Sequence, residues 1–227
     1  MKRFWKEVAV EDGEVRLDGR PVRTPGRAPL ALPAALAEAV AEEWRGVGET
    51  LDPRAMPLTG LANAAIDRIA PDTATFAAGL AAYGETDLLC YRAEGPDDLV
   101  ARQQAAWDPI LAWARERYDV HVETTTGIVH RPQPAATLTR LGEAVASRDA
   151  FALAGLSPVV TTTGTLIGAL ALAEGAINAD TLWTAAHVDE DWQAEQWGHD
   201  PLAAEARAGK RRDYDAGVRF LKLALSS

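Results

Sequence analysis

The stretch Glu7-Val8-Ala9-Val10-Glu11-Asp12-Gly13-Glu14-Val15-Arg16-Leu17 decides the fold class of this 227-residue chain, because its pattern differs from that of the residues after it. Apolar and polar residues alternate in two short runs, as they do along strands that bury one face. Asp12-Gly13 between the runs is a hairpin signal, and Leu17-Asp18-Gly19-Arg20-Pro21 supplies a second turn. The start of the chain therefore predicts a small antiparallel β unit.

The rest of the chain is helical in pattern. Apolar residues recur at helical spacing from Leu32 to Trp44, and Gly46 ends that segment. The same pattern predicts helices over 57–69, 71–83, 97–118, 136–147, 149–156, 158–174, 179–198 and 201–225, with short extended or connecting segments at 87–92 and 120–126. The sequence thus predicts an α+β protein with a β-rich domain at 1–52 and a helical domain at 53–227.

Two prolines and one apolar stripe refine these helices. Pro109 cannot donate its backbone hydrogen bond, so helix 97–118 is expected to kink or to restart with Asp108 as its cap. Pro158 is expected to open a new helix for the same reason. In the last helix one apolar stripe should face the core, and it comprises Tyr214, Val218, Leu221 and Leu225.

Charge and hydropathy exclude several classes of partner. A net charge of -10 and a pI near 4.9 argue against nucleic acid or an anionic membrane surface, because both require a basic face. Residues 150–173 carry no charge, but the strongly apolar part, 166–173, is shorter than the roughly 20 residues that a membrane span needs. A buried core helix is expected there, and no membrane insertion.

Cysteine usage and the chain start indicate the compartment. Cys90 is the single cysteine, so no internal disulfide can form and a reducing compartment is expected. The basic residues of Met1-Lys2-Arg3-Phe4-Trp5-Lys6 precede no apolar segment of the secretory type. We therefore expect a cytoplasmic protein.

The segment Val188-Asp189-Glu190-Asp191-Trp192-Gln193-Ala194-Glu195-Gln196-Trp197-Gly198 combines acids with two indoles on one expected helix. Glu190 lies seven residues after Trp183 and seven before Trp197, so two helical turns place a tryptophan near it on either side. A carboxylate flanked by aromatic rings needs a cationic or hydrogen-bonding partner. That partner is either a group on another protein or an internal arginine such as Arg68 or Arg92.

The positions of the two tryptophans in this segment are compatible with two environments of the helix. Trp192 and Trp197 lie about 140 degrees apart around a helix, so they cannot both face one narrow core stripe. Either one of them is exposed beside the acids, which is the composition of a protein-binding patch, or the helix is packed on two sides.

A metal site is the main alternative for these acids. His187 and Glu190 are spaced to chelate an ion, with Asp191 beside them, and His199 and Asp200 come shortly after. The arrangement occurs once and in the reverse order of the dimetal helical motif, and no further ligand has a fixed relation to it. A metal-dependent hydrolase built on His187, Glu190 and Asp191 is kept as an alternative, as is a general acidic protein-binding scaffold. No phosphate-binding glycine loop is present, and no cofactor is expected.

Seven motifs follow one another over nearly the whole chain: Phe4-Trp5-Lys6, Leu17-Asp18-Gly19-Arg20-Pro21-Val22-Arg23-Thr24-Pro25, Met56-Pro57-Leu58-Thr59, Leu61-Ala62-Asn63-Ala64-Ala65-Ile66-Asp67-Arg68, Asp87-Leu88-Leu89-Cys90-Tyr91-Arg92, Trp107-Asp108-Pro109, and the run from Asp189 to Gly198. Together and in this order they resemble a known family, the assembly chaperones that bind the alpha subunit of F-type ATP synthase. One departure is Gly60, where the family is expected to carry a basic residue.

The resemblance implies a chaperone without enzymatic activity, monomeric when free, that holds the alpha subunit and prevents its aggregation before the catalytic head assembles. It implies a cytoplasmic location here and the mitochondrial matrix for eukaryotic relatives. It also implies that the acid of the Asp-Glu-x-Trp-Gln motif, Glu190, is important for function. The expected partner-binding residues are Asp189, Glu190, Trp192, Gln193 and Trp197.

Overall fold

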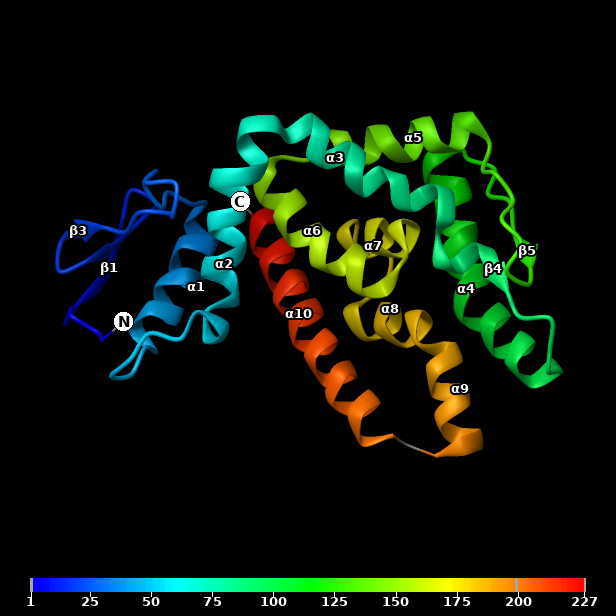
Figure 1. The fold of residues 1–227 in the computed structure, drawn as a ribbon. Helices are drawn as coiled ribbons and strands as arrows, with labels where there is room; N and C mark the ends of the chain where they lie inside the picture. Colours follow the sequence, from blue (N-terminus) through cyan, green and yellow to red (C-terminus); the bar gives the residue numbers. More distant parts are fainter. Residues whose placement is uncertain (1, 199, 227) are drawn as a thin grey trace. The chain divides into compact units, whose positions relative to one another are not determined.

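The computed structural model describes residues 2–198 and 200–226, and it contains a small β-sheet followed in sequence by a larger set of helices (Figure 1). The expected α+β class is confirmed. The helices are α1 (Ala34–Arg45), α2 (Pro57–Ala64), α3 (Thr73–Ala81), α4 (Asp97–Tyr118), α5 (Ala135–Ala146), α6 (Ala150–Thr163), α7 (Leu166–Ala173), α8 (Ala179–Ala186), α9 (Val188–Trp197) and α10 (Pro201–Leu225). A π-helical turn, Ala65–Ile69, continues α2, and shorter 3₁₀ turns cover Pro53–Ala55, Ala70–Asp72, Ala82–Thr86 and Leu88–Cys90.

The chain forms two compact units. The first comprises Met1–Thr73, Arg148–Leu156 and Asp215–Ser227, and the second comprises Ala74–Ser147 and Ser157–Tyr214. Compactness of this kind does not test where an independently folding domain begins. The boundary expected between residues 52 and 53 therefore stays a prediction.

The sheet of the first unit is antiparallel, with strands β1 (Val8–Glu11), β2 (Glu14–Leu17) and β3 (Arg20–Pro21) in that order. Both turns that the sequence predicts are present. Asp12 and Gly13 have φ values of 50° and 78°, and Asp18 and Gly19 have 48° and 76°, the left-handed pair of a type I′ hairpin. Because Asp and Gly tolerate this region best, the local sequence sets the register of the sheet.

The core of the first unit lies where α1 packs on β1 and β2. Val15 and Leu36 are fully buried, and the Trp5 and Trp44 rings meet edge to face with centroids 5.2 Å apart. An aromatic pair of this kind contributes about 0.5–1.5 kcal/mol beyond its buried area. Trp44 therefore anchors α1 in the core of this unit.

The second unit is built around α4, which contacts α7, α8 and α9. Trp107 of α4 is 1% exposed, and its indole Nε1 donates to the Ala185 carbonyl at 2.7 Å. Every residue of α7 from Leu166 to Leu172 is buried, as expected for the uncharged stretch. No helix in the described part of the chain combines the length and apolar character that crossing a bilayer requires.

A second, two-stranded sheet pairs β4 (Tyr91–Arg92) with β5 (Thr125–Thr126) in parallel. The extended segments expected at 87–92 and 120–126 thus contribute one short strand each. The first four residues of 87–92 instead contain the 3₁₀ turn Leu88–Cys90.

The helix starts expected at the prolines do not occur, whereas the alternative expectation of a kink at Pro109 stays a prediction. α6 passes through Pro158 and ends at Thr163, where Gly164 adopts a φ of 68° and Thr165 caps α7 by accepting from Gly168 N at 2.9 Å. α4 likewise continues past Pro109, and the Asp108 carboxylate accepts from Arg92 at 2.6 Å instead of capping a new helix. The left-handed glycine ends a helix here, whereas the prolines are tolerated.

The helix expected over 179–198 is also interrupted. α8 ends at Ala186, and α9 begins at Val188 after His187, whose φ and ψ are -117° and 16°. The His187 Nδ1–H donates to the Trp183 carbonyl at 2.8 Å, so a side chain satisfies a backbone acceptor at this helix end. Trp183 and Glu190 therefore lie on different helices.

We predict that Gly155→Ala destabilises the protein by about 1–3 kcal/mol, because a Cβ there would lie 2.6 Å from Leu221 N and 2.8 Å from Leu221 Cα. Backbone atoms cannot move aside as a flexible side chain can. Urea unfolding measures the loss. Gly79→Ala is the control, because its Cβ meets nothing within 4 Å, and it should stabilise α3 by about 0.5–1 kcal/mol. Equal effects of the two changes would contradict this packing argument.

Candidate functional site

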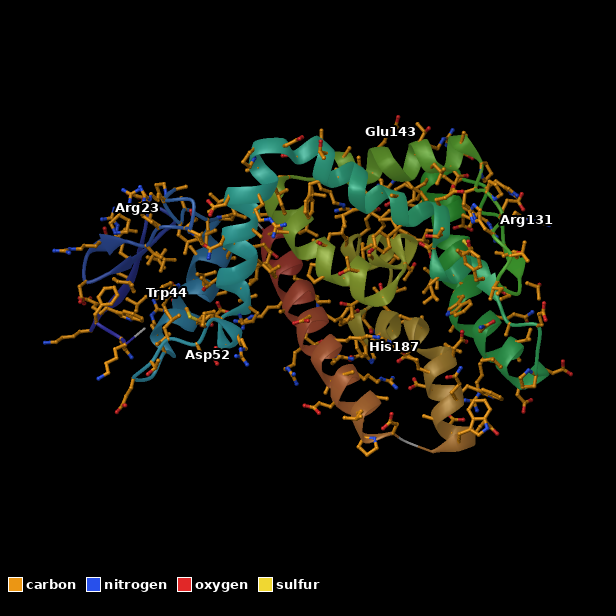
Figure 2. The ribbon with its side chains drawn as sticks, viewed as in Figure 1. Arg23, Trp44, Asp52, Arg131, Glu143 and His187 are labelled. Carbon is orange, nitrogen blue, oxygen red and sulfur yellow. The ribbon has the colours of Figure 1, made fainter. Side chains whose placement is uncertain are left out.

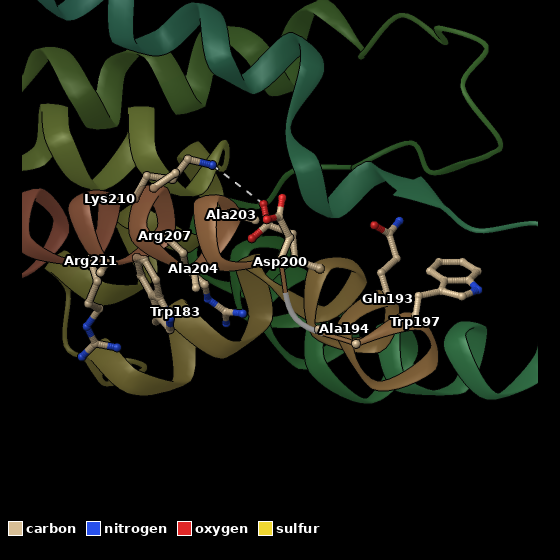
Figure 3. Close-up of a pocket in the computed structure, with 14 residues that line it drawn as sticks. Trp183, Gln193, Ala194, Trp197, Asp200, Ala203, Ala204, Arg207, Lys210 and Arg211 are labelled. Atoms are coloured by element: carbon tan, nitrogen blue, oxygen red, sulfur yellow. Dashed lines mark ion pairs between the residues drawn. The ribbon is translucent and has the colours of Figure 1, made fainter.

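The candidate site lies in the second unit, between α9 and the first half of α10. These helices, with Trp183 of α8, line an open groove of about 880 Å³ (Figure 3). Figure 2 labels His187 near the junction of α8 and α9. The residues from Asp189 to Trp197 that the sequence indicates are all carried by α9.

Two ion pairs connect this acidic region to α10. Arg207 of α10 donates to the Asp191 carboxylate, and this hydrogen bond raises the pKa of the Arg207 guanidinium. Arg211 donates to Asp180 of α8 at 2.7 Å and lies over the Trp183 ring, 5.0 Å from its centroid. The acids of α8 and α9 thus hold the basic side of α10.

Glu190 is engaged more weakly than its neighbours. Its side chain is 52% exposed, and its oxygens lie 3.8 Å from Lys210 Nζ and 3.9 Å from His187 Nε2. The dashed line at Lys210 in Figure 3 marks the first of these pairs. Both distances exceed those of a hydrogen bond. Its internal cation among the described residues is Lys210. Arg92, one of the two candidate arginines, pairs with Asp108 instead, and the other, Arg68, belongs to the first unit. The carboxylate therefore keeps its capacity to accept a strong hydrogen bond.

His187 is a buried neighbour of Glu190. It is 3% exposed, and its ring stacks on Trp183 with centroids 3.9 Å apart. Burial lowers the pKa of His187, although the hydrogen bond to the Trp183 carbonyl and the nearby Glu190 charge act in the opposite direction. His187 is thus held neutral in the folded protein more firmly than in water.

A lowered histidine pKa makes stability depend on pH. The contribution of His187 is fully present above its ordinary pKa of 6.5 and is lost as pH falls through the lower pKa of the folded state. The free energy of unfolding of the wild type should therefore fall relative to that of His187→Phe, which keeps a ring but cannot titrate, between about pH 7.5 and 5.5. Urea unfolding of both proteins at the two pH values tests this. An unchanged difference between them would show that His187 does not titrate in this way.

The two tryptophans of α9 have different environments. Trp197 is 75% exposed, and Trp192 is half-buried with its ring 5.7 Å from that of Trp197, edge to face. The expectation that one indole is exposed beside the acids is confirmed. Gln193 is also exposed, and no hydrogen bond of its side chain occurs within residues 2–198 and 200–226.

Asp189 faces the interior of the unit instead. Its carboxylate accepts from Gln103 Nε2 at 2.7 Å, and Gln103 Oε1 accepts from the Ala93 amide at 2.8 Å. Gln103 is 1% exposed. Asp189 therefore fixes α9 to α4, and the buried Gln103 is a partner that the helical pattern alone did not single out.

The residues of the metal alternative do not converge. Asp191 pairs with Arg207, and the nearest Glu190 oxygen is 3.9 Å from His187 Nε2. Among the described residues no group of three or more His, Cys, Asp or Glu is arranged to hold a metal ion. His199, which belonged to the same sequence cluster, lies outside the described residues.

Most other motif residues have internal structural partners. In the first unit Thr24 Oγ1 donates to Asp67 at 2.6 Å, and Gly26 N donates to the other Asp67 oxygen at 2.7 Å. Glu43 caps α2 by accepting from Thr59 N at 2.7 Å. These contacts join segments distant in sequence, so the motifs that contain them stabilise the unit.

The same holds in the second unit. Asp87 is fully buried and accepts backbone hydrogen bonds. Arg92 donates to Asp108 and lies over the Trp107 ring, 5.1 Å from its centroid. Of the residues predicted to bind a partner, Glu190, Gln193 and Trp197 are exposed, and they form a candidate surface on α9 that we call the α9 face.

Two residues near the α9 face were not predicted from the sequence. Leu202, in the first turn of α10, is 76% exposed, and Lys210 lies against Glu190. The signal for Leu202 was a large apolar residue in the Pro201-Leu202-Ala203-Ala204 run. Lys210 was visible only as part of a basic run.

One family model and several solved structures match this chain. The family model described as ATP12 chaperone protein matches residues 2–115. The chain is similar to the crystal structure of Atp12 from Paracoccus denitrificans, with a TM-score of 0.93 and 43% identity over 98% of each chain. A mutant of that protein matches with the same identity and TM-score, covering 98% of this chain and 97% of the other. The Atu1473 protein of Agrobacterium tumefaciens has a TM-score of 0.93 and 41% identity over 97% of this chain and 85% of that one.

Proposed function

Because the chain belongs to the ATP12 chaperone family, we propose that it binds the free alpha subunit of F-type ATP synthase and prevents its aggregation until the catalytic head assembles. Membership of the family supports a role as a chaperone of ATP synthase assembly, and we propose that this chaperone has no enzymatic activity. Beyond family membership, we propose that the client is the alpha subunit, that the free protein is a monomer and that it is located in the cytoplasm. Holding a client in this way needs no cofactor.

We place the client contact on the α9 face, Glu190, Gln193 and Trp197, with Asp189 and Trp192 supporting it from behind. The observation that carries this assignment is which motif residues have internal partners and which are exposed. In the other motifs, residues such as Asp67, Asp87 and Arg92 have internal partners, although Phe4 and Arg68 are exposed. The three side chains of the α9 face are exposed together on one helix and make weak or no hydrogen bonds among the described residues. Motif residues without an internal role are the ones available to a partner.

The composition of this surface suits a protein client. Exposed tryptophan beside charged residues is enriched in protein interfaces, where the ring fills a pocket and the charges orient the partner. A subunit that awaits assembly exposes apolar surface later buried against its neighbours. Trp197 and Leu202, 75% and 76% exposed, offer apolar area to cover it.

Glu190→Lys is predicted to weaken alpha-subunit binding by about tenfold, since reversing one half-exposed charge removes an attraction and adds a repulsion. The fold should survive, because exposed ion pairs such as that with Lys210 contribute about 0–1 kcal/mol. Glu143→Lys is the matched control, since it makes the same charge change at an exposed position of α5 (Figure 2). If Glu190→Lys unfolds the protein, or if both variants bind equally, the site assignment is wrong.

The proposed function is tested by adding the purified protein to alpha subunit diluted from denaturant and measuring light scattering. We expect suppressed scattering and a co-purifying complex with the alpha subunit. A general acidic scaffold would give a different result, namely binding that fades steeply with salt and shows no preference for the alpha subunit. That result would contradict the proposed function and favour a general acidic scaffold.

A further inference from the structure

The groove beside the α9 face is built differently at its two ends. Toward the turn between the helices its walls are small side chains, Ala194 on α9 and Ala203, Ala204 and Ala206 on α10. Toward α8 they are Trp183, Glu190 and the basic residues of α10. Residues 201–206 of α10 are all exposed, so these two helical turns present an apolar face to solvent.

The walls of the groove determine which backbone conformation an occupant can adopt. Both walls are α-helices, and away from the helix ends their backbone donors and acceptors are already paired within the helix. An extended segment would find no sheet edge to join, and its own backbone groups would lose water without replacement. A helix brings its backbone already hydrogen-bonded, and alanine-lined walls let its axis approach closely.

Charge in the groove favours a cationic partner. Its walls carry two carboxylates, Glu190 and Asp200, and neither accepts a hydrogen bond from a charged side chain among residues 2–198 and 200–226. Two of the basic side chains in the walls pair with acids that do not line the groove, Arg207 with Asp191 and Arg211 with Asp180. Lys210 lies 3.8 Å from Glu190 and competes with any incoming cation for it.

Building on the proposed function, we propose that the groove between α9 and α10 receives an amphipathic helix of the alpha subunit. Small or aliphatic residues of that helix pack on Ala203 and Ala204. A lysine or arginine of the same helix reaches Glu190 and displaces Lys210. Trp197, at the rim of the groove, covers the apolar side of the bound helix.

A bulky side chain inside the groove tests the docking mode. Ala203→Trp fills the groove from α10, and because Ala203 is exposed the variant should fold. Glu205→Trp is the matched control, since it lies roughly 160 degrees away around the same helix and outside the groove. We expect Ala203→Trp to weaken alpha-subunit binding by about tenfold or more and Glu205→Trp to change it by less than about twofold. Wild-type affinity in Ala203→Trp would overturn the proposal.

The sign of the charge interaction is tested at Lys210. Removing the competitor in Lys210→Gln should leave alpha-subunit binding unchanged or tighter, whereas Glu190→Gln should weaken it. Weaker binding of Lys210→Gln, together with unchanged or tighter binding of Glu190→Gln, would show that the client presents an anion to Lys210, and it would overturn the cation assignment.

A photo-crosslinking amino acid at position 203 identifies the occupant. Mass spectrometry of the crosslinked product should give a helical segment of the alpha subunit that contains a lysine or arginine. Crosslinks to a strand or loop of that subunit, or to a second copy of this chain, would overturn the proposal. If the wild-type protein forms no complex with the alpha subunit, the proposed function fails. If it forms one that Ala203→Trp does not affect, only the groove inference fails.

Discussion

Replacement of Trp197 by alanine is expected to weaken binding of the isolated alpha subunit by about thirtyfold or more, equivalent to about 2 kcal/mol. Tryptophan anchors account for a large share of the energy of many interfaces, and Trp197 is 75% exposed in the free protein. Burial of its ring against a client would remove a large apolar area from water. Isothermal titration of the alpha subunit into each protein measures the change.

Phe4→Ala is the matched control for this experiment. Phe4 is also aromatic and 70% exposed, but it lies in the first unit and outside the α9 face. We expect its binding to remain within about twofold of the wild type, since most exposed residues outside a hot spot contribute little. The unfolding midpoints of both variants should match the wild type. A loss in Phe4→Ala as large as that in Trp197→Ala would mean that the decrease reflects general exposed hydrophobicity, and not a specific site.

The largest loss of stability is expected for Asp87→Ala, at about 2–4 kcal/mol. Asp87 is fully buried, and its two oxygens accept from Leu89 N at 3.0 Å and from Ile167 N at 2.9 Å. It therefore joins the 3₁₀ turn Leu88–Cys90 to the N-terminus of α7. Alanine would leave both N–H groups buried without an acceptor.

The cost of Asp87→Ala should also depend on pH. Burial raises the pKa of Asp87 to about 6 from an ordinary 3.8, although the hydrogen bonds to Ile167 and Thr165 lower it. A raised carboxyl pKa gives stability that is complete below 3.8 and is lost as pH rises through about 6. The difference in unfolding free energy between wild type and Asp87→Ala should therefore widen by about 1 kcal/mol as pH falls from about 7 to about 5.

Chemical denaturation at the two pH values measures both effects. Asp149→Ala is the control, because Asp149 also caps a helix, accepting from Ala152 N at 2.8 Å, but it is exposed. Asp149→Ala should lower the free energy of unfolding by about 1 kcal/mol, which is the usual effect of removing an exposed helix cap. A difference for Asp87→Ala that narrows toward the lower pH would contradict the direction of its pKa shift.

Local chemistry made parts of the fold predictable. The Asp-Gly pairs at 12–13 and 18–19 require positive φ, which few other residues adopt, so the sequence determines the hairpin directly. The stripe on α10 was predicted from spacing, and Tyr214, Val218 and Leu221 are buried, although Leu225 at the end is 46% exposed. Strong periodicity and special backbone geometry depend on a few neighbouring residues, so both can be predicted from the sequence.

The helix breaks lie at a left-handed glycine and at a histidine, and not at the prolines where they were expected. Pro158 was expected to begin a helix, but the break lies at Gly164, where a φ of 68° and the Thr165 cap divide α6 from α7. A threonine after a glycine is a signal that could have located it. The end of α8 has no glycine or proline. It is marked by the His187 hydrogen bond and by its stacking on Trp183.

The candidate site was predictable in composition but not in orientation. Acids and an exposed indole were expected on one segment, and Glu190 and Trp197 are exposed there. Spacing could not reveal that Asp189 turns inward to Gln103, or that the internal cation beside Glu190 is Lys210. Both facts depend on how α9 packs against α4, which is distant in sequence, and against α10, which is the next helix.

Recognition of the alpha subunit through the α9 face is tested most directly by sedimentation velocity, with fluorescently labelled protein and isolated alpha or beta subunit. We predict a stoichiometric complex with the alpha subunit, no complex with the beta subunit, and loss of the alpha complex in Trp197→Ala. Equal binding of both subunits, or an alpha complex that Trp197→Ala leaves intact, would contradict this mode of recognition.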